Sequence, residues 1–168
     1  MVAFDSNRYE REIREIGTLS QEYSELDWTV ITKDGCSLLT HRVYRGCTTW
    51  DFTVSFSESY QVPVLWFHAW DSSGRPLTFE QVWASVSSNV RESVLKDPWT
   101  AITQQDHPIF QKPCFQIHPC QTEKIMGELT TDWTKANFVF SWLSIFAGIF
   151  GIHFSPEVAQ NMNKSNRS

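Results

Sequence analysis

The amino-acid sequence predicts an α+β domain in which helices at the N- and C-terminal ends pack on a central antiparallel sheet of about four strands. Three observations support this prediction. Residues 4–26 carry apolar side chains at helical spacing, residues 28–70 hold four strand-like runs, and residues 138–154 contain no Asp, Glu, Lys or Arg. A chain of 168 residues can bury one sizeable core, so residues 1–168 are expected to form one domain.

The first expected element is an N-terminal helix over residues 4–26. Tyr9, Ile13 and Ile16 follow one another at steps of three and four, while Arg and Glu fill the positions between them. Asp5 or Ser6 can cap the first turn with its side chain. We interpret this segment as a helix that lies over the sheet, and a helix that binds a partner protein is the alternative.

The next four segments have the pattern of a meander of antiparallel strands, because short turns join them. Asp34-Gly35 marks a tight turn after the first segment, and residues 71–74 turn the chain after the last. The third segment alternates apolar and polar side chains, which is typical of a strand with one buried face. In chain order the segments are residues 28–32, 38–44, 50–56 and 62–70.

Residues 76–90 predict a short helix that begins near Thr78, and residues 89–105 are polar and expected to be partly irregular. A short strand then alternates Phe115 and Ile117 with Gln116 and His118. Pro119 ends this strand because it has no N–H for the ladder. Cys120 therefore lies on a stiff turn just past a strand end and is expected to be exposed, and residues 27–122 are expected to form the sheet and this corner.

A helical region is expected over residues 123–155, and its apolar part approaches the length of a membrane span. Serines and glycines interrupt that part, so we interpret it as a buried helix, with a membrane span as the alternative. The polar residues 156–168 are expected to fray.

Composition and charge exclude several classes of protein. A net charge of -5 without a basic run argues against nucleic acid as a partner. The N-terminus shows no secretory signal, so the four cysteines are expected to be thiols in a reducing compartment. Cys36 and Cys47 are predicted to be small apolar fillers on neighbouring strands. The 8 Trp and 12 Phe indicate an aromatic core that leaves some aromatic surface for a partner.

The first two possible roles of Cys120 are a zinc ligand and the nucleophile of a cysteine peptidase. A zinc site could combine it with Cys114, His118 and His107, but the two cysteines are six residues apart, and paired zinc ligands usually stand about two to four apart. A cysteine peptidase needs a base that faces the thiol, and a histidine only two residues away is not expected to do so. The histidines that remain open as a base are His41, His68, His107 and His153.

A carrier thiol is the third reading. A thioester on cysteine persists in water and still reacts readily with an amine, so a carrier needs an accessible thiol on a rigid corner and surfaces for its protein partners. The aromatic-rich, acidic chain fits this role without a metal or a cofactor, and no Cys-x-x-Cys pair points to redox chemistry.

Several segments together resemble the autophagy-related ubiquitin-like conjugating enzymes, over about residues 28–150. The most specific of them is the His-Pro-Cys element that ends in Cys120. The matching segments are Gly74-Arg75-Pro76-Leu77, His107-Pro108-Ile109-Phe110, Pro113-Cys114-Phe115, His118-Pro119-Cys120-Gln121-Thr122 and Phe140-Ser141-Trp142-Leu143.

This resemblance implies a variant of the ubiquitin-conjugating fold, with Cys120 as the thioester nucleophile. The cysteine would take the C-terminal glycine of a ubiquitin-like protein, autophagy-related protein twelve, from an activating enzyme, autophagy-related protein seven. It would then pass the modifier to a lysine of autophagy-related protein five. The resemblance also implies a cytoplasmic enzyme with no cofactor and no direct membrane span. Partner proteins would bring it to the site of autophagosome assembly.

The resemblance further implies that Tyr60, in the run Tyr60-Gln61-Val62-Pro63, lies opposite the reactive cysteine. Our hypothesis is that Tyr60 and His118 orient the thioester carbonyl and donate to the developing oxyanion. The alternative is that Tyr60 only packs and His118 only caps the strand end. Conjugating enzymes of the ordinary ubiquitin pathway carry an Asn in a His-Pro-Asn run, and here the cysteine itself follows His-Pro.

A sister branch, autophagy-related protein three, shares the His-Pro-Cys element and attaches its modifier to a lipid. Its members carry a long acidic insertion and an N-terminal helix that seeks membranes. Residues 4–26 have a mixed charged face that suits anionic lipid poorly, and no long insertion is present. A lipid-conjugating enzyme and a binding module without catalysis therefore stay as alternatives, together with the peptidase.

Overall fold

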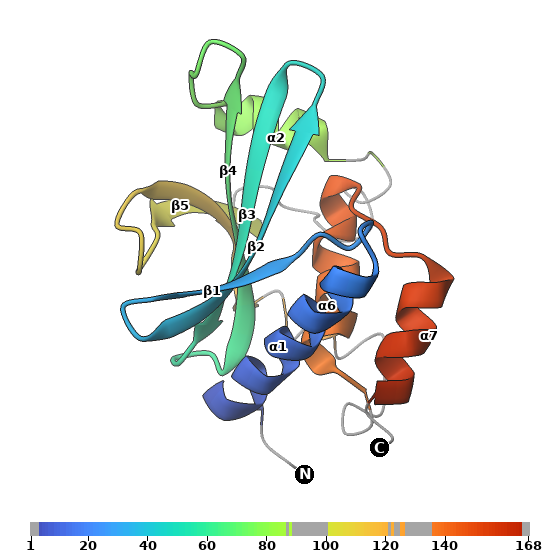
Figure 1. Ribbon diagram of the computed structural model, residues 1–168. Helices are drawn as coiled ribbons and strands as arrows, with labels where there is room; N and C mark the ends of the chain where they lie inside the picture. The colour runs from blue at the N-terminus through green and yellow to red at the C-terminus, as the bar shows by residue number, and fades with distance from the viewer. Residues whose placement is uncertain are drawn as a thin grey trace.

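The computed structural model describes residues 4–86, 88, 101–120, 122, 125–126 and 136–165 (Figure 1). The predictions made for residues 89–100, and for most of the helical region between residues 123 and 135, lie outside these residues.

The described strands form one antiparallel sheet in the order β1-β2-β3-β4-β6-β5. The predicted α+β class with an antiparallel sheet is confirmed, and the predicted number of about four strands is too low, because this sheet has six. The strands are β1 (Thr29–Lys33), β2 (Cys36–Arg45), β3 (Thr48–Ser57), β4 (Val62–Asp71), β5 (Ile102–Asp106) and β6 (Pro113–Ile117).

Strand β5 is the element that the sequence pattern missed. It pairs with β6 at the edge of the sheet, with Ile102 opposite Ile117 and Asp106 opposite Pro113. Only Ile102 of the five residues is buried. An edge strand with one buried side chain shows no alternation of apolar and polar residues, so its sequence looked irregular.

The helices α1 (Ser6–Glu22), α6 (Phe138–Phe146) and α7 (Pro156–Ser165) lie together on one side of the sheet, as Figure 1 shows. The short helix α2 (Phe79–Ser85) begins at Thr78, which caps it as predicted, and the 3-10 turn η1 (Gly148–Phe150) follows α6. The core between these layers is aromatic. Its fully buried rings include Trp50, Phe52, Phe67, Phe146 and Phe150.

Helix α1 lies directly on the sheet, as predicted, and ends at Glu22 rather than at residue 26. Asp5 caps it by accepting the backbone N–H of Arg8 at 2.8 Å. A Cβ atom added at Gly17 would stand 2.9 Å from a methyl group of Val30 on β1. The glycine in the middle of this helix is therefore explained by the close approach of helix and strand.

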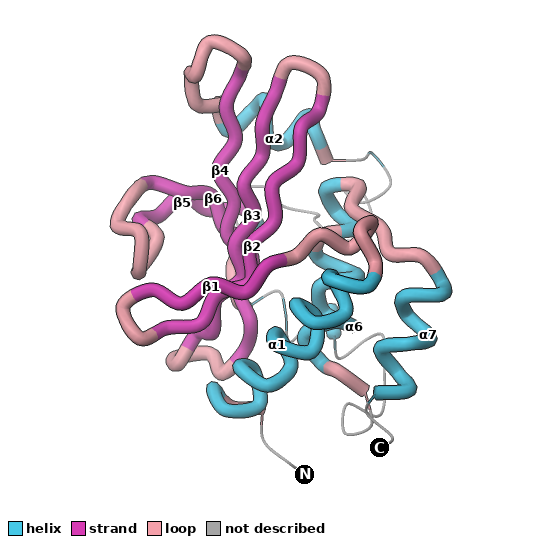
Figure 2. Tube along the Cα trace, in the orientation of Figure 1, coloured by secondary structure: helices cyan, strands magenta, loops and turns pink. Residues whose placement is uncertain are grey.

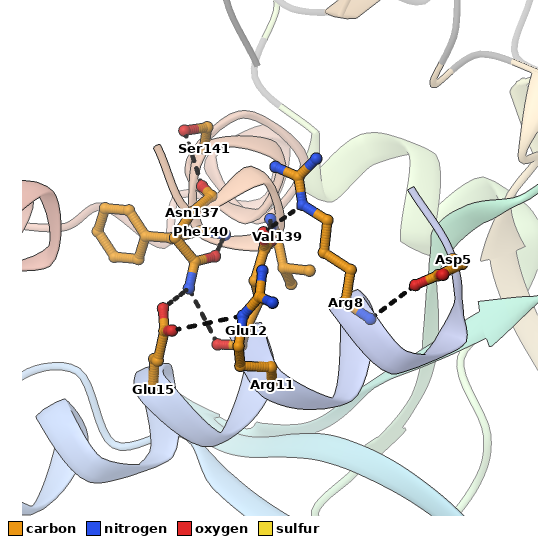
Figure 3. A network of polar contacts seen from close by, with 9 residues as sticks. All are labelled: Asp5, Arg8, Arg11, Glu12, Glu15, Asn137, Val139, Phe140 and Ser141. Atoms are coloured by element: carbon orange, nitrogen blue, oxygen red, sulfur yellow. Dashed lines mark hydrogen bonds and ion pairs between the residues drawn. The ribbon is translucent and has the colours of Figure 1, made fainter. Parts of the chain in front are cut away.

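A buried polar network joins α1 to the start of α6 (Figure 3). The carboxylate of Glu12 is 2% exposed and accepts the Nε–H of Arg8 at 2.7 Å and the backbone N–H of Val139 at 2.9 Å. Asn137 caps α6 and also donates to the carbonyl of Glu12 at 3.0 Å. Burial raises the pKa of Glu12, while the hydrogen bonds from Val139 and Arg8 oppose that rise.

The C-terminal segment differs from its prediction at residues 156–165. These residues form α7 instead of a frayed tail, because Val158 and Met162 stand four residues apart on one face and are buried against the core. The apolar run before it is divided between α6 and η1. In the described part of the chain, no helix combines the length and the apolar character needed to cross a membrane.

Two cysteine predictions are wrong. Cys36 and Cys47 are exposed rather than buried fillers. Cys36 follows the turn at Gly35, and Cys47 lies in the turn between β2 and β3, so neither thiol faces the core. A strand end next to a tight turn projects beyond the layer of helices, and the side-chain pattern of the strand no longer decides burial there.

Candidate active site

The end of β6 and the turn between β3 and β4 build the site around Cys120. Strand β4 pairs antiparallel with β6, with Trp66 opposite Gln116 and Phe67 opposite Phe115. The C-terminal end of β6 therefore runs toward the start of β4 and the turn that precedes it. Pro119 leaves the ladder at that point, and Cys120 follows it as an exposed side chain.

The thiol of Cys120 contacts His118. The Sγ atom lies 2.8 Å from Nδ1 of His118, and the backbone N–H of Cys120 donates to the same nitrogen at 3.2 Å. A nitrogen that accepts a backbone N–H carries no proton of its own, so the hydrogen-bond network assigns the ring proton to Nε2. The thiol is then the donor to Nδ1, and the ring nitrogen is placed to take its proton.

This contact corrects the expectation that a histidine two residues before the cysteine would not face it. The backbone N–H of His118 donates to the carbonyl of Ala101 at 2.9 Å, which fixes the residue just past β6. Pro119 then turns the chain, and the turn folds Cys120 back toward the imidazole. An alternation rule for strand side chains does not apply once the strand has ended.

Tyr60 stands beside His118. The two rings meet edge to face, with centroids 5.7 Å apart at an angle of 84°, and the tyrosine is 50% exposed. The turn that carries it is tight, because the backbone N–H of Gln61 donates to the carbonyl of Ser57 at 2.7 Å and Gln61 adopts a φ of 53°. Tyr60, from the turn between β3 and β4, and His118, from the end of β6, thus meet at the same corner.

An open groove of about 400 Å³ starts at this corner. Tyr60, His118 and Pro119 line one part of it, and outward side chains of β4 form its floor, among them Trp66. Trp66 is held in place by its Nε1–H, which donates to Ser55 at 2.9 Å. The groove lies on the face of the sheet opposite to α1 and α6 and reaches His118 and Pro119, the two residues before Cys120.

Carboxylates also line the groove, and the sequence pattern gave no sign of them. Glu58 comes from the β3–β4 turn and Asp106 from the end of β5, so they are far apart in the sequence. Their meeting depends on the pairing of β5 with β6, which the sequence analysis did not predict. Both residues lie in polar segments of the sequence, and polarity alone does not indicate a site.

The described residues do not offer a set of ligands for the zinc alternative. Among the described residues, no three His, Cys, Asp or Glu side chains are grouped so that they could hold a metal ion. Cys114 is buried, and burial raises the pKa of its thiol. His107 is also buried, and its Nδ1 accepts backbone N–H groups, so that atom is occupied by the protein itself.

The peptidase alternative lacks an orienting group. His41 stacks on Trp28 and His68 lies beside Trp70, so these two rings are engaged elsewhere. The His153 ring lies next to Gly148, where an added Cβ atom would stand 3.8 Å from it. Among the described residues, no Asp, Glu or Asn side chain is hydrogen-bonded to His118. Within that part of the chain, the dyad of thiol and imidazole is present without the third member that a peptidase triad uses.

Comparison with known proteins adds sequence and structural relatives. A family model described as "Autophagocytosis associated protein, active-site domain" matches residues 9–157. The ubiquitin-like-conjugating enzyme ATG10 of Homo sapiens is 34% identical over 139 residues, which are 80% of this chain and 63% of that protein. The enzyme of the same name from Arabidopsis thaliana is 32% identical over 116 residues, 65% of this chain and 52% of that protein.

The chain therefore spans between half and two thirds of the length of these curated relatives. A solution structure of KmAtg10 matches it with a TM-score of 0.57 at 20% sequence identity, over 92% of this chain and 99% of that one. At this identity the match shows a shared fold.

Proposed function

Since the chain belongs to the family of autophagocytosis-associated active-site domains, we propose that it is a ubiquitin-like conjugating enzyme of autophagy that carries its modifier on Cys120. The modifier is bound through its C-terminal glycine as a thioester and is then passed to a lysine of an acceptor protein. The observation that carries this proposal is the exposed Cys120 thiol, which lies 2.8 Å from Nδ1 of His118 at a fixed strand end.

Loading is an exchange between a thiol and a thioester. The sulfur of Cys120 attacks the glycine carbonyl that is bound to a cysteine of the activating enzyme, a new C–S bond forms, and the old one breaks. The proton of the Cys120 thiol passes to Nδ1 of His118, and the departing thiolate of the activating enzyme recovers a proton. One thioester replaces another, so the step needs no strong base and is close to balanced in free energy.

Transfer forms an amide. The neutral lysine amine attacks the thioester carbonyl, a C–N bond forms and the C–S bond breaks. Cys120 leaves as a thiolate, and the one proton that the attacking nitrogen loses restores the thiol. The Nε2–H of His118 and the hydroxyl of Tyr60 are donors that suit the oxygen on which negative charge develops. The groove beside Tyr60 provides room for the extended C-terminal tail of the modifier.

The relatives named ubiquitin-like-conjugating enzymes ATG10 support the class of reaction. For the partners we propose those that the sequence resemblance implies. They are autophagy-related protein twelve as modifier, autophagy-related protein seven as activating enzyme and autophagy-related protein five as acceptor. The reaction would take place in the cytoplasm, with partners as the route to the site of autophagosome assembly.

Reconstitution with purified proteins tests this function. The full chain is mixed with the activating enzyme, ATP and the modifier, and the products are separated with and without thiol reductant. We expect one adduct of chain and modifier that reductant removes, and peptide mapping should place it on Cys120. A chain that forms no adduct, or one whose adduct maps to the exposed Cys36 or Cys47, contradicts the proposal.

The roles of Tyr60 and His118 are tested separately on the loaded enzyme. Tyr60→Phe and His118→Ala are each expected to slow the attack of lysine on the preformed thioester by about 10²-fold, because each removes one donor to the oxyanion. Single-turnover discharge with excess acceptor measures this rate. Tyr44→Phe is the matched control, since Tyr44 is 74% exposed on another hairpin. Unchanged discharge in both variants would leave Tyr60 and His118 with a packing and capping role.

A further inference from the structure

A second hollow, of about 440 Å³, lies on the face of the sheet opposite to α1 and α6, and it adjoins the groove at Cys120 through the shared side chain of Trp66. Its floor is made of side chains that alternate along the strands with the core residues, such as Thr40, Thr53 and His68. Its walls are the β1–β2 hairpin and the loop at residues 107–112, which project to the same side of the sheet in Figure 2.

The two walls meet at their tips through a shared aromatic ring. The Nζ atom of Lys33, from the β1–β2 hairpin, lies 4.8 Å from the ring centroid of Phe110, and the Nζ atom of Lys112 lies 5.5 Å from the same centroid. In the described part of the chain neither lysine forms an ion pair with a carboxylate. Two ammonium groups thus stand over the ring of Phe110, and that of Lys112 belongs to a residue that lines the hollow.

The wall of the hollow contains a buried donor without an acceptor. His107 is 1% exposed, and its Nδ1 accepts the backbone N–H groups of Ile109 at 3.1 Å and Phe110 at 3.3 Å. The proton is therefore on Nε2, which is buried and has no hydrogen-bond partner among the described residues. Burial, together with the charges of Lys112 and Lys33, lowers the pKa of His107 to about 4, so the ring is neutral at pH 7.

The acidic side chains of the hollow are engaged elsewhere. Asp51 binds Arg42 through both oxygens, at 2.5 and 2.7 Å, which leaves that pair without net charge. The Asp27 carboxylate lies 3.9 Å from Nδ1 of His41, on a side chain that is largely exposed. Within the described ranges, the groups near Phe110 that form no ion pair or hydrogen bond are the ammonium groups of Lys33 and Lys112 and the Nε2–H of His107, all donors. A buried donor without an acceptor is costly to keep.

We propose that this hollow binds a ligand through a carboxylate group, which accepts from Nε2–H of His107 and pairs with the ammonium group of Lys112. Trp66 and Phe110, whose ring centroids lie 4.8 and 4.7 Å from that of His107, supply apolar surface for the carbon atoms of the ligand. The partly exposed ring of Phe110 helps to shield the imidazole, so binding includes a rotation of this side chain toward solvent. The site is independent of the thioester chemistry at Cys120.

Titration of the full chain, followed by NMR of its ¹⁵N-labelled imidazole and backbone N–H groups, tests the site. Glutarate serves as a free dicarboxylate, and the capped peptide acetyl-Gly-Glu-Gly-amide presents the same group as an acidic side chain. We expect at least one of them to shift the Nε2–H of His107 and the amide of Lys112 in a saturable way, with a midpoint in the range of about 1 to 10 mM. Saturation by the peptide assigns the site to an acidic side chain, and saturation by glutarate alone assigns it to a free acid.

Two controls make the titration decisive. Glutaramide has the same length without charge and should leave the His107 signal unmoved, as should sodium chloride at equal ionic strength. Lys112→Ala, at an exposed position, is expected to weaken binding by about 10-fold, while Lys164→Ala on α7 leaves it unchanged. Shifts that do not saturate, that glutaramide reproduces or that Lys112→Ala leaves intact overturn the proposal.

Discussion

Replacing Cys120 by serine is expected to convert the reductant-labile adduct with the modifier into one that survives thiol reductant and is cleaved by alkali. The serine oxygen occupies the place of the exposed sulfur beside Nδ1 of His118 and forms an oxygen ester, which amines attack far more slowly than a thioester. Transfer to the acceptor lysine should fall by at least about 10³-fold, because the oxygen ester is a much poorer acyl donor to an amine than the thioester. Gel separation with reductant and with alkali, followed by single-turnover transfer, measures both effects.

The chain supplies its own controls for this variant. Cys36→Ser and Cys47→Ser change thiols that are also exposed but lie in or beside hairpin turns, and both should load and transfer like the unchanged chain. Cys120→Ala should form neither a thioester nor an ester. If Cys120→Ser still gives a reductant-labile adduct, another thiol is the carrier and the proposed site is wrong.

The position of Cys120 was predictable from local rules, whereas its partner was not. An alternating strand, a proline and a cysteine in succession are enough to place a thiol just beyond a strand end. The contact with His118 depends on how the chain turns after Pro119, where strand periodicity gives no guidance. Tyr60 was predicted only from the family resemblance. Its place beside His118 follows from the pairing of β4 with β6, which the pattern around Tyr60 does not reveal.

The fold was predictable where one face of an element is buried. Strand β3 alternates Trp50, Phe52 and Val54 with polar residues, and these three side chains do line the core. The sequence pattern did not predict β5 and α7, in which only a few side chains are buried. Such elements are stabilised by one neighbour in the tertiary structure, which a pattern within the element cannot reveal.

The buried network at Glu12 gives the second large expectation, a loss of folding stability. Arg8→Met removes the cation beside a carboxylate that is 2% exposed and leaves that charge without its partner. We expect the free energy of unfolding at pH 7 to fall by about 3 to 5 kcal/mol, as measured by urea denaturation. Arg14→Met is the matched control on the same helix, because Arg14 pairs with Glu10 at 3.7 Å on the exposed side, and it should cost less than about 1 kcal/mol.

The dependence of this loss on pH separates charge from packing. Burial already raises the pKa of Glu12, and removal of Arg8 takes away one of the groups that hold it down. A carboxyl group with a raised pKa in the folded state favours folding when it is protonated. The deficit of Arg8→Met should therefore be smallest near pH 4 and grow as the pH rises through the folded-state pKa.

Combining Arg8→Met with Glu12→Gln completes the double-mutant cycle. The amide oxygen of Gln can still accept the backbone N–H of Val139, and no buried charge remains. The double variant should therefore be more stable at pH 7 than Arg8→Met alone, by roughly 2 kcal/mol, and this difference should shrink as the pH falls toward 4 and Glu12 of Arg8→Met becomes protonated. A deficit of equal size in both variants and at every pH would mean that Arg8 acts through packing of its alkyl chain, and that the charge of Glu12 does not govern the junction of α1 and α6.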